Sequence, residues 1–365
     1  MTRSKNTYSL SRRGLLQMAG AAGVLAAIKP TGLSAAEPKS AETKADEPKP
    51  AIASREAEPR DWAKVRGFNY QPSFGRNGIE IWIDKFDAEI VDRELGLGRQ
   101  YFPKMNAVRL WLSHDAFLKS PKSFIDNFEA TLKSCEKHRM RAVPVLFNNW
   151  HSVPDFGGIS TEMIGYWFTD FGQKGESANY VFRPYLEAIF QDHALDSRVL
   201  AWDLCNEPFN NGRETYIDWL RHTYRLAKTM GAKQPIGVSV AASVGDLQAV
   251  EPFSDVLMIH PYFAERVSWD PIKEFARKQG KPLLATECCW GSLDDARRAA
   301  IIRSDLEVLA KQGIGFLAHA LQESYVADLH RPQFGVVSGA EYMAFVNLDG
   351  VLRAGHEVFN QYCGE

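Results

Sequence analysis

The sequence predicts a single α/β domain, a closed (β/α)8 barrel. The first observation behind this prediction is a series of short apolar runs separated by helical patterns, which is typical of parallel strands covered by helices. The second is length, because about 300 residues follow Asp61, within the range of one such barrel. The third is the number of apolar runs, which is eight: residues 64–70, 106–112, 141–147, 198–207, 235–241, 255–260, 282–287 and 314–320.

Some of the intervening helices have recognisable ends. Residues 270–280 start with Asp-Pro and stop at a glycine, which predicts a helix between those positions. Ser292, with Asp295 three residues later, resembles a capping box, and Gly313 is expected to end the helix that follows.

Two connections are longer than a barrel requires. Residues 148–178 are polar and contain glycine, and a connection of that length predicts a functional loop after strand three. A second long loop, of roughly 20 residues, follows strand eight. It leads to residues 342–347 and to a turn at residues 348–351.

The first 60 residues are not expected to belong to the barrel. The motif Ser-Arg-Arg-Gly at residues 11–14 opens a weakly apolar stretch, so residues 1–36 are typical of a twin-arginine signal peptide. A membrane anchor is the alternative, but roughly 15 apolar positions fall short of the ~20 that span a bilayer. Residues 37–60 have the composition of a disordered linker, and residues 61–365 form the barrel domain. We therefore expect export to the periplasm or the exterior.

The composition argues against several partners. With 43 basic and 45 acidic residues, the net charge of −2 favours neither nucleic acid nor an anionic membrane as a partner. The sequence contains no glycine-rich phosphate loop, and the five cysteines have no metal-ligand spacing. These cysteines are expected to be small buried hydrophobic residues. We expect a monomer without cofactor or metal and without stable membrane insertion.

The strongest functional signal lies at residues 201–208. An apolar run ends there in Asn206, Glu207 and Pro208, and proline cannot continue a strand. Glu207 is therefore expected at the carboxyl end of a strand, where barrels of this type place their active sites. An ordinary polar turn is the alternative. Glu287 is expected to end strand seven in the same way, so the two carboxylates would face each other across the barrel mouth.

Paired carboxylates are what the cleavage of an acetal requires. One protonates the departing oxygen, while the other stays ionised and attacks the anomeric carbon. Like charges in close quarters push the two pKa values apart, which separates the roles. Arg109 and the Tyr262 hydroxyl are expected to keep Glu287 anionic, and Glu207 is the better acid.

Further polar and aromatic residues lie at or near predicted strand ends. The candidate substrate-binding residues are Arg109, Asn148, Asn149, His151, Trp202, Asn206, His260, Tyr262, Trp290, His319 and Gln322. Separately they have ordinary interpretations: Arg109 could pair with a structural carboxylate, and His260 with Tyr262 could be a packed core pair. Jointly, and in this order along the strands, they favour an active site.

Four motifs carry a resemblance to a known family: Val108-Arg109-Leu110, the run from Trp202 to Pro208 that contains Asn-Glu-Pro, His260-Pro261-Tyr262, and Ala285-Thr286-Glu287. With them the chain resembles the clan of retaining glycoside hydrolases built on a TIM barrel, close to the family-5 cellulases and mannanases. The likeness covers nearly everything from about Val65 to Phe359.

This resemblance implies a role for each matching residue. The implied acid/base is Glu207 and the implied nucleophile is Glu287. Asn206 would hold the 2-hydroxyl of the sugar, while Arg109 and Tyr262 would order the nucleophile. The implied activity is hydrolysis of a β-linked glycan such as a β-glucan or mannan, with no cofactor.

The chain departs from the family pattern at two positions. Members usually place a Trp at the end of strand eight, where this chain has His319. They also place a His on strand three, where this chain offers Asn148, Asn149 and His151. An imidazole donates hydrogen bonds where an indole mainly stacks, so the sugar bound here can differ from glucose or mannose.

Two other classes of function compete with a glycosidase. A carbohydrate-binding barrel that has lost catalysis is suggested by the missing Trp, but such a protein has no reason to keep costly buried charges. A metal-dependent hydrolase would need a His-x-His strand end or clustered Asp and His ligands, and the sequence shows neither.

Overall fold

The computed structural model describes residues 61–149, 181–211, 213–325, 330–331, 335–336 and 342–364. The predicted signal peptide and linker, His151, and most of the two predicted long loops lie outside these residues. Among the described residues, none of the helices combines the length and apolarity that crossing a bilayer requires.

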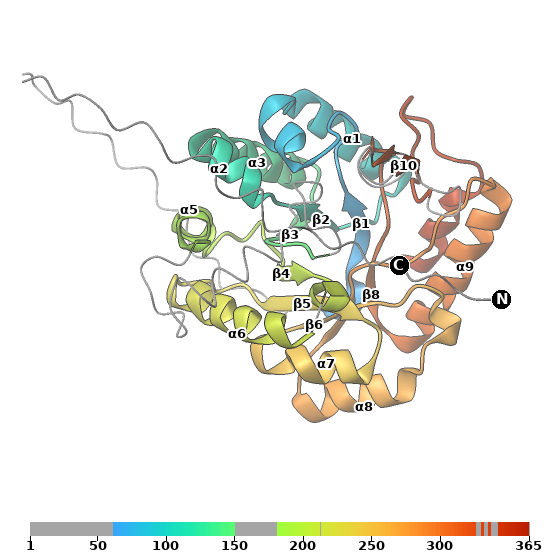
Figure 1. Ribbon diagram of the computed structural model, residues 1–365. Coiled ribbons are helices and arrows are strands. Elements are labelled where there is room, and N and C mark those ends of the chain that lie inside the picture. The colour runs from blue at the N-terminus through green and yellow to red at the C-terminus, as the bar shows by residue number, and fades with distance from the viewer. Residues whose placement is uncertain are drawn as a thin grey trace, which may run out of the picture. The chain divides into compact units, whose positions relative to one another are not determined.

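Eight parallel strands form a closed barrel in sequence order, which confirms the predicted fold (Figure 1). The strands are β1 (Arg66–Tyr70), β2 (Ala107–Trp111), β3 (Arg141–Val145), β4 (Trp202–Asn206), β5 (Ile236–Ala241), β6 (Leu257–His260), β7 (Leu283–Ala285) and β8 (Gly315–Ala318). Each lies within one of the eight predicted runs. Pairing of β1 with β8, for example Gly67 with Leu317, closes the barrel.

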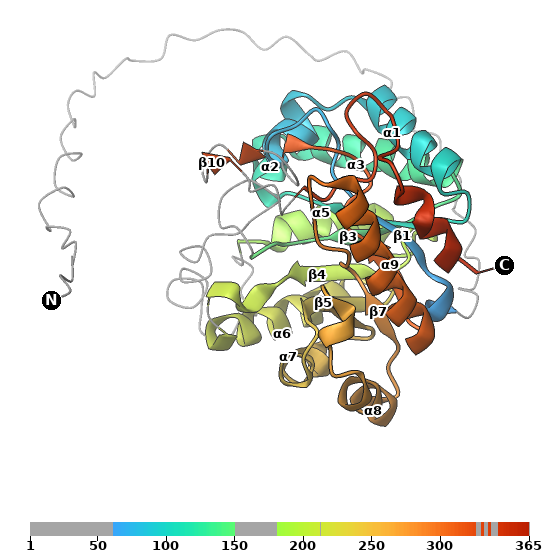
Figure 2. The same cartoon turned by 90° about the vertical axis from the view of Figure 1, so that its right-hand side faces the viewer.

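Helices surround the barrel (Figures 1 and 2). The α-helices are α1 (Ala88–Tyr101), α2 (His114–Lys119), α3 (Pro121–Lys137), α5 (Arg183–His193), α6 (Arg213–Thr229), α7 (Val244–Val250), α8 (Trp269–Gln279) and α9 (Asp295–Gln312). Shorter turns are η1 (Trp62–Lys64), the π-helix η2 (Glu80–Asp84), η3 (Pro208–Asn211), η4 (Glu251–Phe253), η5 (Ala264–Arg266) and η8 (His356–Tyr362). A two-stranded ribbon of β9 (His330–Arg331) and β10 (Gly335–Val336) follows β8.

The predicted helix ends are right in two cases and wrong in one. Gly280 and Gly313 end α8 and α9 in left-handed conformations, as expected of C-terminal glycines. The capping box at Ser292 is wrong, because the N-cap of α9 is Asp294, whose side chain accepts from the amide of Arg297. The Ser292 hydroxyl oxygen instead accepts from the amide of Asp294, two residues before the position that would cap the helix.

Side chains on the inner face of the barrel change from apolar to polar along several of the strands, β2 and β6 among them. A floor of buried apolar residues that includes Ala107, Met258 and Leu317 fills the lower interior. Side chains two positions further on point the same way. Arg109 in the middle of β2, His260 at the end of β6 and His319 just after β8 therefore lie above this floor.

Candidate active site

Arg109 is the centre of a buried polar network. Its guanidinium has no exposed surface and donates to Asp203 Oδ2 (3.0 and 2.7 Å), Asn69 Oδ1 (2.9 Å), Asn206 Oδ1 (2.7 Å), Ser239 Oγ (2.9 Å) and Glu287 Oε1 (2.5 Å). These five partners come from four strands or strand ends: β1, β4, β5 and β7. One side chain thus fixes the relative positions of most of the site.

A strand irregularity explains how β4 supplies two of these partners. The register between β4 and β5 shifts between Asp203 and Asn206, and such a bulge re-aims the side chains that follow it. Asp203 and Asn206 therefore both reach Arg109, although ordinary alternation would place them on opposite faces. Glu207 follows in a left-handed conformation (φ 46°), and its amide donates to the carbonyl oxygen of Ser239 (2.9 Å).

Glu287 is held as an anion. Its Oε1 accepts from Arg109 and its Oε2 from the Tyr262 hydroxyl (2.7 Å), as predicted. Burial alone would raise the pKa of Glu287, but the charges of His260, Arg109 and His319, together with the Tyr262 hydrogen bond, lower that pKa to about 2. Glu287 was predicted as the last residue of its strand, but the strand-seven ladder ends earlier, at Ala285.

Glu207 has a different environment from Glu287. Its side chain is 23% exposed, against 7% for Glu287, and its Oε1 lies 2.8 Å from His260 Nδ1. The same nitrogen lies 3.7 Å from Glu287 Oε2, so one imidazole stands between the two carboxylates. Glu207 therefore has both His260 and solvent within reach for proton transfer, while both oxygens of Glu287 already accept hydrogen bonds from Arg109 and Tyr262.

The two carboxylates are close together. One ligand atom from each of Glu207, His260 and Glu287 lies within 4.8 Å of the others, which is also a spacing that could hold a metal ion. Arg109 and Tyr262 already occupy both oxygens of Glu287, so this carboxylate has its positive and donating partners without a metal. Glu129, His193 and Asp196 form a second such group, into which Arg198 donates.

His319 and two aromatic residues line the side of the site near Glu287. His319 Nδ1 lies 3.0 Å from the Tyr262 hydroxyl and 3.7 Å from Glu287 Oε2. The ring of Trp111 stacks on His319 at 5.8 Å, and the ring of Trp290 meets Tyr262 edge-on at 5.0 Å. The predicted strand-eight position of His319 is therefore within the site, beside the nucleophile candidate.

The two asparagines after β3 have different tasks. Asn148 accepts from the side-chain amide of Asn206 (2.9 Å), so it orients that residue. Asn149 is fully buried, donates to the carbonyl oxygen of Pro208 (2.6 Å) and accepts from Tyr216 (2.7 Å). It stabilises the turn after Glu207.

Two predicted site residues need correction. Trp202 has no exposed surface and packs against Phe190 (5.0 Å) and Phe128 (6.4 Å) in the core, so its prediction as a substrate contact is wrong. Neighbours on a strand face opposite ways, and Asp203 takes the inward direction. Gln322 is 2% exposed, and its amide nitrogen donates to the carbonyl oxygen of Asn347 (3.0 Å), so it supports that turn.

Four residues of the site were not predicted from the sequence: Asn69, Trp111, Asp203 and Ser239. Trp111 could have been found, because it lies two positions after Arg109 on the same strand and so shares its face. Asn69 and Ser239 are single polar residues within apolar strands, a weaker signal. Asp203 stands beside Trp202, and residue type alone does not show which of these two neighbours faces the interior.

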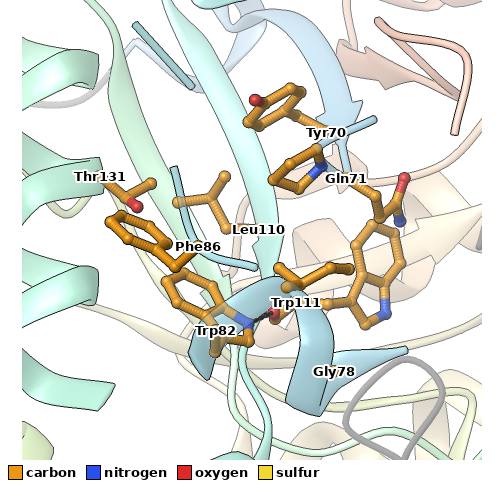
Figure 3. A pocket seen from close by; sticks show the side chains of 10 residues that line it. Tyr70, Gln71, Gly78, Trp82, Phe86, Leu110, Trp111 and Thr131 are labelled. Carbon is orange, nitrogen blue, oxygen red and sulfur yellow. Dashed lines mark hydrogen bonds between the residues drawn. The ribbon is translucent and has the colours of Figure 1, made fainter. Parts of the chain in front are cut away.

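Pockets among the described residues border this region, including one of about 320 Å³ lined by Phe263 and Trp290. One of about 500 Å³ is lined by His260 and Tyr262 together with Ser243, Arg266 and Ser268. Another, shown in Figure 3, is lined by Gln71, Trp82 and Trp111 among others, and its volume of about 20 Å³ suits one water molecule.

No family model matches the chain, but individual proteins do. A probable mannan endo-1,4-beta-mannosidase A of Aspergillus clavatus is 28% identical over 116 residues, 31% of this chain and 31% of that protein. The mannan endo-1,4-beta-mannosidase A of Hypocrea jecorina is 22% identical over 190 residues, 49% and 39% of the two chains. The matches thus span less than half of the length of these curated relatives.

Solved structures with the same fold cover more of the chain. A GH5_18 protein from Bifidobacterium longum subsp. infantis has a TM-score of 0.61 at 15% identity, covering 82% of this chain and 78% of its own. An endo-beta-1,4-mannanase from Thermotoga petrophila has a TM-score of 0.56 at 13% identity, covering 82% and 76%. The resemblance inferred from the sequence is thus confirmed: this chain is similar to family-5 mannan endo-1,4-beta-mannosidases in sequence and shares the closed barrel of glycoside hydrolases.

Proposed function

We propose that this protein is a β-glycoside hydrolase that cleaves a β-linked glycan by double displacement, with Glu287 as nucleophile and Glu207 as acid/base. The observation that carries the proposal is the pair of adjacent carboxylates with unequal surroundings. One is buried among donors and anionic, and the other is partly exposed and bonded to an imidazole. One carboxylate oxygen of Glu207 and one of Glu287 lie no more than 4.8 Å apart. This distance supports retention, since inverting enzymes hold their carboxyl groups ~6.5–9.5 Å apart.

In the first step Glu287 attacks the anomeric carbon and forms a glycosyl ester. The glycosidic C–O bond breaks as this bond forms, and the departing oxygen takes its proton from Glu207. Arg109 and Tyr262 hold the two oxygens of Glu287, so the carboxylate needs no reorientation before it attacks. They also stabilise it again as a leaving group.

In the second step Glu207, now ionised, removes a proton from a water molecule. The hydroxide attacks the anomeric carbon, and the bond to Glu287 breaks with inversion at that carbon. Two inversions give net retention. His260, 2.8 Å from Glu207 Oε1, holds this carboxylate in place through both proton transfers.

The substrate proposed first is a β-1,4-mannan or an oligosaccharide of it. The names of the matching relatives support this choice, because they are mannan endo-1,4-beta-mannosidases. Asn206 is the residue proposed to bond the sugar 2-hydroxyl, since Arg109 and Asn148 fix both ends of its amide. Export by the twin-arginine route is proposed from the first 36 residues of the sequence.

The experiment that tests the proposal is an assay of the purified full chain on manno-oligosaccharides and on activated aryl β-mannosides and β-glucosides. Glu287→Gln should lower kcat by roughly four orders of magnitude or more. The control is Glu94→Gln, another buried carboxylate with a Tyr partner, in α1. It should leave kcat unchanged. Proton NMR of the first product should show the β-anomer.

Full activity of Glu287→Gln would overturn the proposal. Oligosaccharide binding by calorimetry, with no product after days, would favour a binding barrel without catalysis instead. Complete loss of turnover in EDTA, restored by a divalent metal, would favour a metal-dependent hydrolase at the group formed by Glu207, His260 and Glu287.

A further inference from the structure

Asp305 is a buried carboxylate of α9 whose contacts the proposed reaction does not explain. It is 1% exposed. Its Oδ1 accepts from the backbone amide of Ala264 (2.7 Å), and its Oδ2 accepts from the backbone amide of Cys289 (2.8 Å). Helix α9, coloured orange, lies on the near side of the barrel in Figure 2. A single side chain of an outer helix thus holds two separate loop segments.

Both of these segments carry residues of the candidate active site. Ala264 lies two residues after Tyr262, and Cys289 lies two residues after Glu287. Tyr262 and Glu287 meet in the site through a hydrogen bond of 2.7 Å. The carboxylate of Asp305 therefore bonds the backbones of the same two segments whose side chains, Tyr262 and Glu287, meet in the site.

Each segment also has an unfavourable backbone conformation at the point where Asp305 binds it. Phe263, just before Ala264, has φ 55°, and Cys289 has φ 68°. Residues other than glycine rarely adopt this left-handed region, and they persist there only where surrounding contacts hold them. Asp305 accepts hydrogen bonds from the amide of Ala264, which follows Phe263, and from the amide of Cys289 itself.

The charge state of Asp305 matters for this arrangement. Burial, with a further contribution from Glu265 of η5, raises the pKa of Asp305 to about 6, although the two amides and Arg298 of α9 act in the opposite direction. The Cys288 thiol, whose sulfur contacts that of Cys289, is the neighbouring titratable group from the segment after β7. Only the ionised carboxylate offers both oxygens as free acceptors, because protonation turns one of them into a donor that faces an amide N–H.

We propose that Asp305 is a positioning residue that holds the Tyr262 and Glu287 segments in register for catalysis. This inference rests on the proposed function, since it assigns Glu287 as the nucleophile and Tyr262 as its donor. When Asp305 takes up a proton, one of the two segments loses its bond to α9. Glu287 and Tyr262 then shift relative to each other, while substrate contacts elsewhere remain.

The first test is the variant Asp305→Asn, whose amide nitrogen cannot accept from a backbone N–H. We expect kcat to fall between about tenfold and 100-fold, the range of a small misplacement of reacting groups, with little change in KM. The wild type should lose kcat as the pH falls through about 6. His260 and His319 also face the site, so the expected signature is the disappearance of this acid limb in Asp305→Asn.

The matched control is Asp196→Asn. Asp196 is also a buried carboxylate that accepts a backbone amide, from Arg198 (2.9 Å), but it precedes β4 at the opposite end of the barrel. This variant should lose stability and keep the wild-type kcat per folded molecule. Equal losses of kcat in the two variants would mean that Asp305 acts only through stability, and would overturn the proposal.

The second test needs no variant. In the full wild-type chain, the amide resonances of Ala264 and Cys289 should titrate together with a midpoint near pH 6. Separate midpoints, or no titration between about pH 4 and 8, would overturn the proposal that one carboxylate, that of Asp305, holds both amides. The two proposals fail differently: full activity of Glu287→Gln overturns the hydrolase, whereas an unchanged kcat of Asp305→Asn in an enzyme that Glu287→Gln inactivates overturns only this inference.

Discussion

The Nδ1 atom of His319 lies 3.0 Å from the hydroxyl oxygen of Tyr262. The hydroxyl has one proton, and the anionic Glu287 carboxylate accepts it at 2.7 Å. The Tyr262 oxygen must then accept from His319, so the imidazole carries a proton on Nδ1. A chain of donors thus runs from the end of β8 to the proposed nucleophile, at the position where the family resemblance implies a Trp.

The first prediction concerns this chain. His319→Phe keeps a ring that can stack on Trp111 but removes the donor to Tyr262, and it should lower kcat by up to about tenfold, the value of one hydrogen bond. Tyr262→Phe should have a larger effect because Glu287 loses a direct donor. In a double-mutant cycle, the effects of the two changes should be less than additive, since they break one chain.

Strictly additive effects on kcat would contradict this chain, because they would mean that His319 acts independently of Tyr262. Nitrogen-15 NMR gives a second measurement. The His319 ring should show a protonated Nδ1 in the wild type, and this signal should shift in Tyr262→Phe.

The second prediction concerns Glu207. Glu207→Ala should lower turnover of unactivated glycosides by about 10² to 10⁴-fold, the usual contribution of general acid–base catalysis. An aryl glycoside with a good leaving group needs no acid, so the glycosyl ester on Glu287 should still form. Azide can attack that ester without a base, and its addition should restore turnover and yield a β-glycosyl azide. Absence of azide rescue with an activated substrate would speak against Glu207 as the acid/base.

The third prediction concerns stability. Arg109→Ala leaves Asp203 and Glu287 buried without their cation, and removing one partner of a buried ion pair costs about 3–5 kcal/mol in free energy of unfolding. Urea denaturation measures this loss. The control is Lys122→Ala, which breaks an exposed pair with Asp126 and should cost no more than about 1 kcal/mol. A similar loss in both variants would mean that the Arg109 network does not stabilise the fold.

The fourth prediction concerns the pH dependence of stability. The pKa of Glu287 is about 2 in the folded protein, against an ordinary value of 4.5, so the unfolded chain binds the proton more readily. The ionised group therefore stabilises the fold above about pH 4.5, and this contribution is lost as the pH falls toward 2. The stability difference between the wild type and Glu287→Gln should shrink over that interval in urea titrations. A stability difference that grows as the pH falls would show that folding does not lower the pKa of Glu287.

Much of the fold could be predicted because its signals are local. Each strand is a short apolar run, and the polar residues that end it are adjacent in sequence. The eight strands, and the strand-end positions of Glu207, His260 and His319, follow from that pattern. The barrel then brings these ends together, because parallel strands in a closed sheet share one face.

Predictions that depended on side-chain direction were less successful. Trp202 and Asp203 are neighbours that face opposite ways, and the residue that faces the interior is Asp203, two positions after the inward-facing Ala201. The bulge that follows Asp203 then brings Asn206 to the same face, which is a property of the pairing of β4 with β5. The start of α9 depended similarly on which of two polar residues reaches a free amide, and Asp294 does so instead of Ser292. Neither choice is visible in residue type alone.

The sequence by itself determined the barrel, its strand order along the chain and the two glutamates at its mouth, because apolar periodicity and strand ends are properties of short segments. Only the tertiary structure decided the partners of each charge. Arg109 meets Asn69, Asp203 and Glu287, and Asp305 holds segments 41 and 16 residues away. The reason is that a hydrogen bond depends on distance and direction in space, which the closure of the barrel sets for residues far apart in the chain.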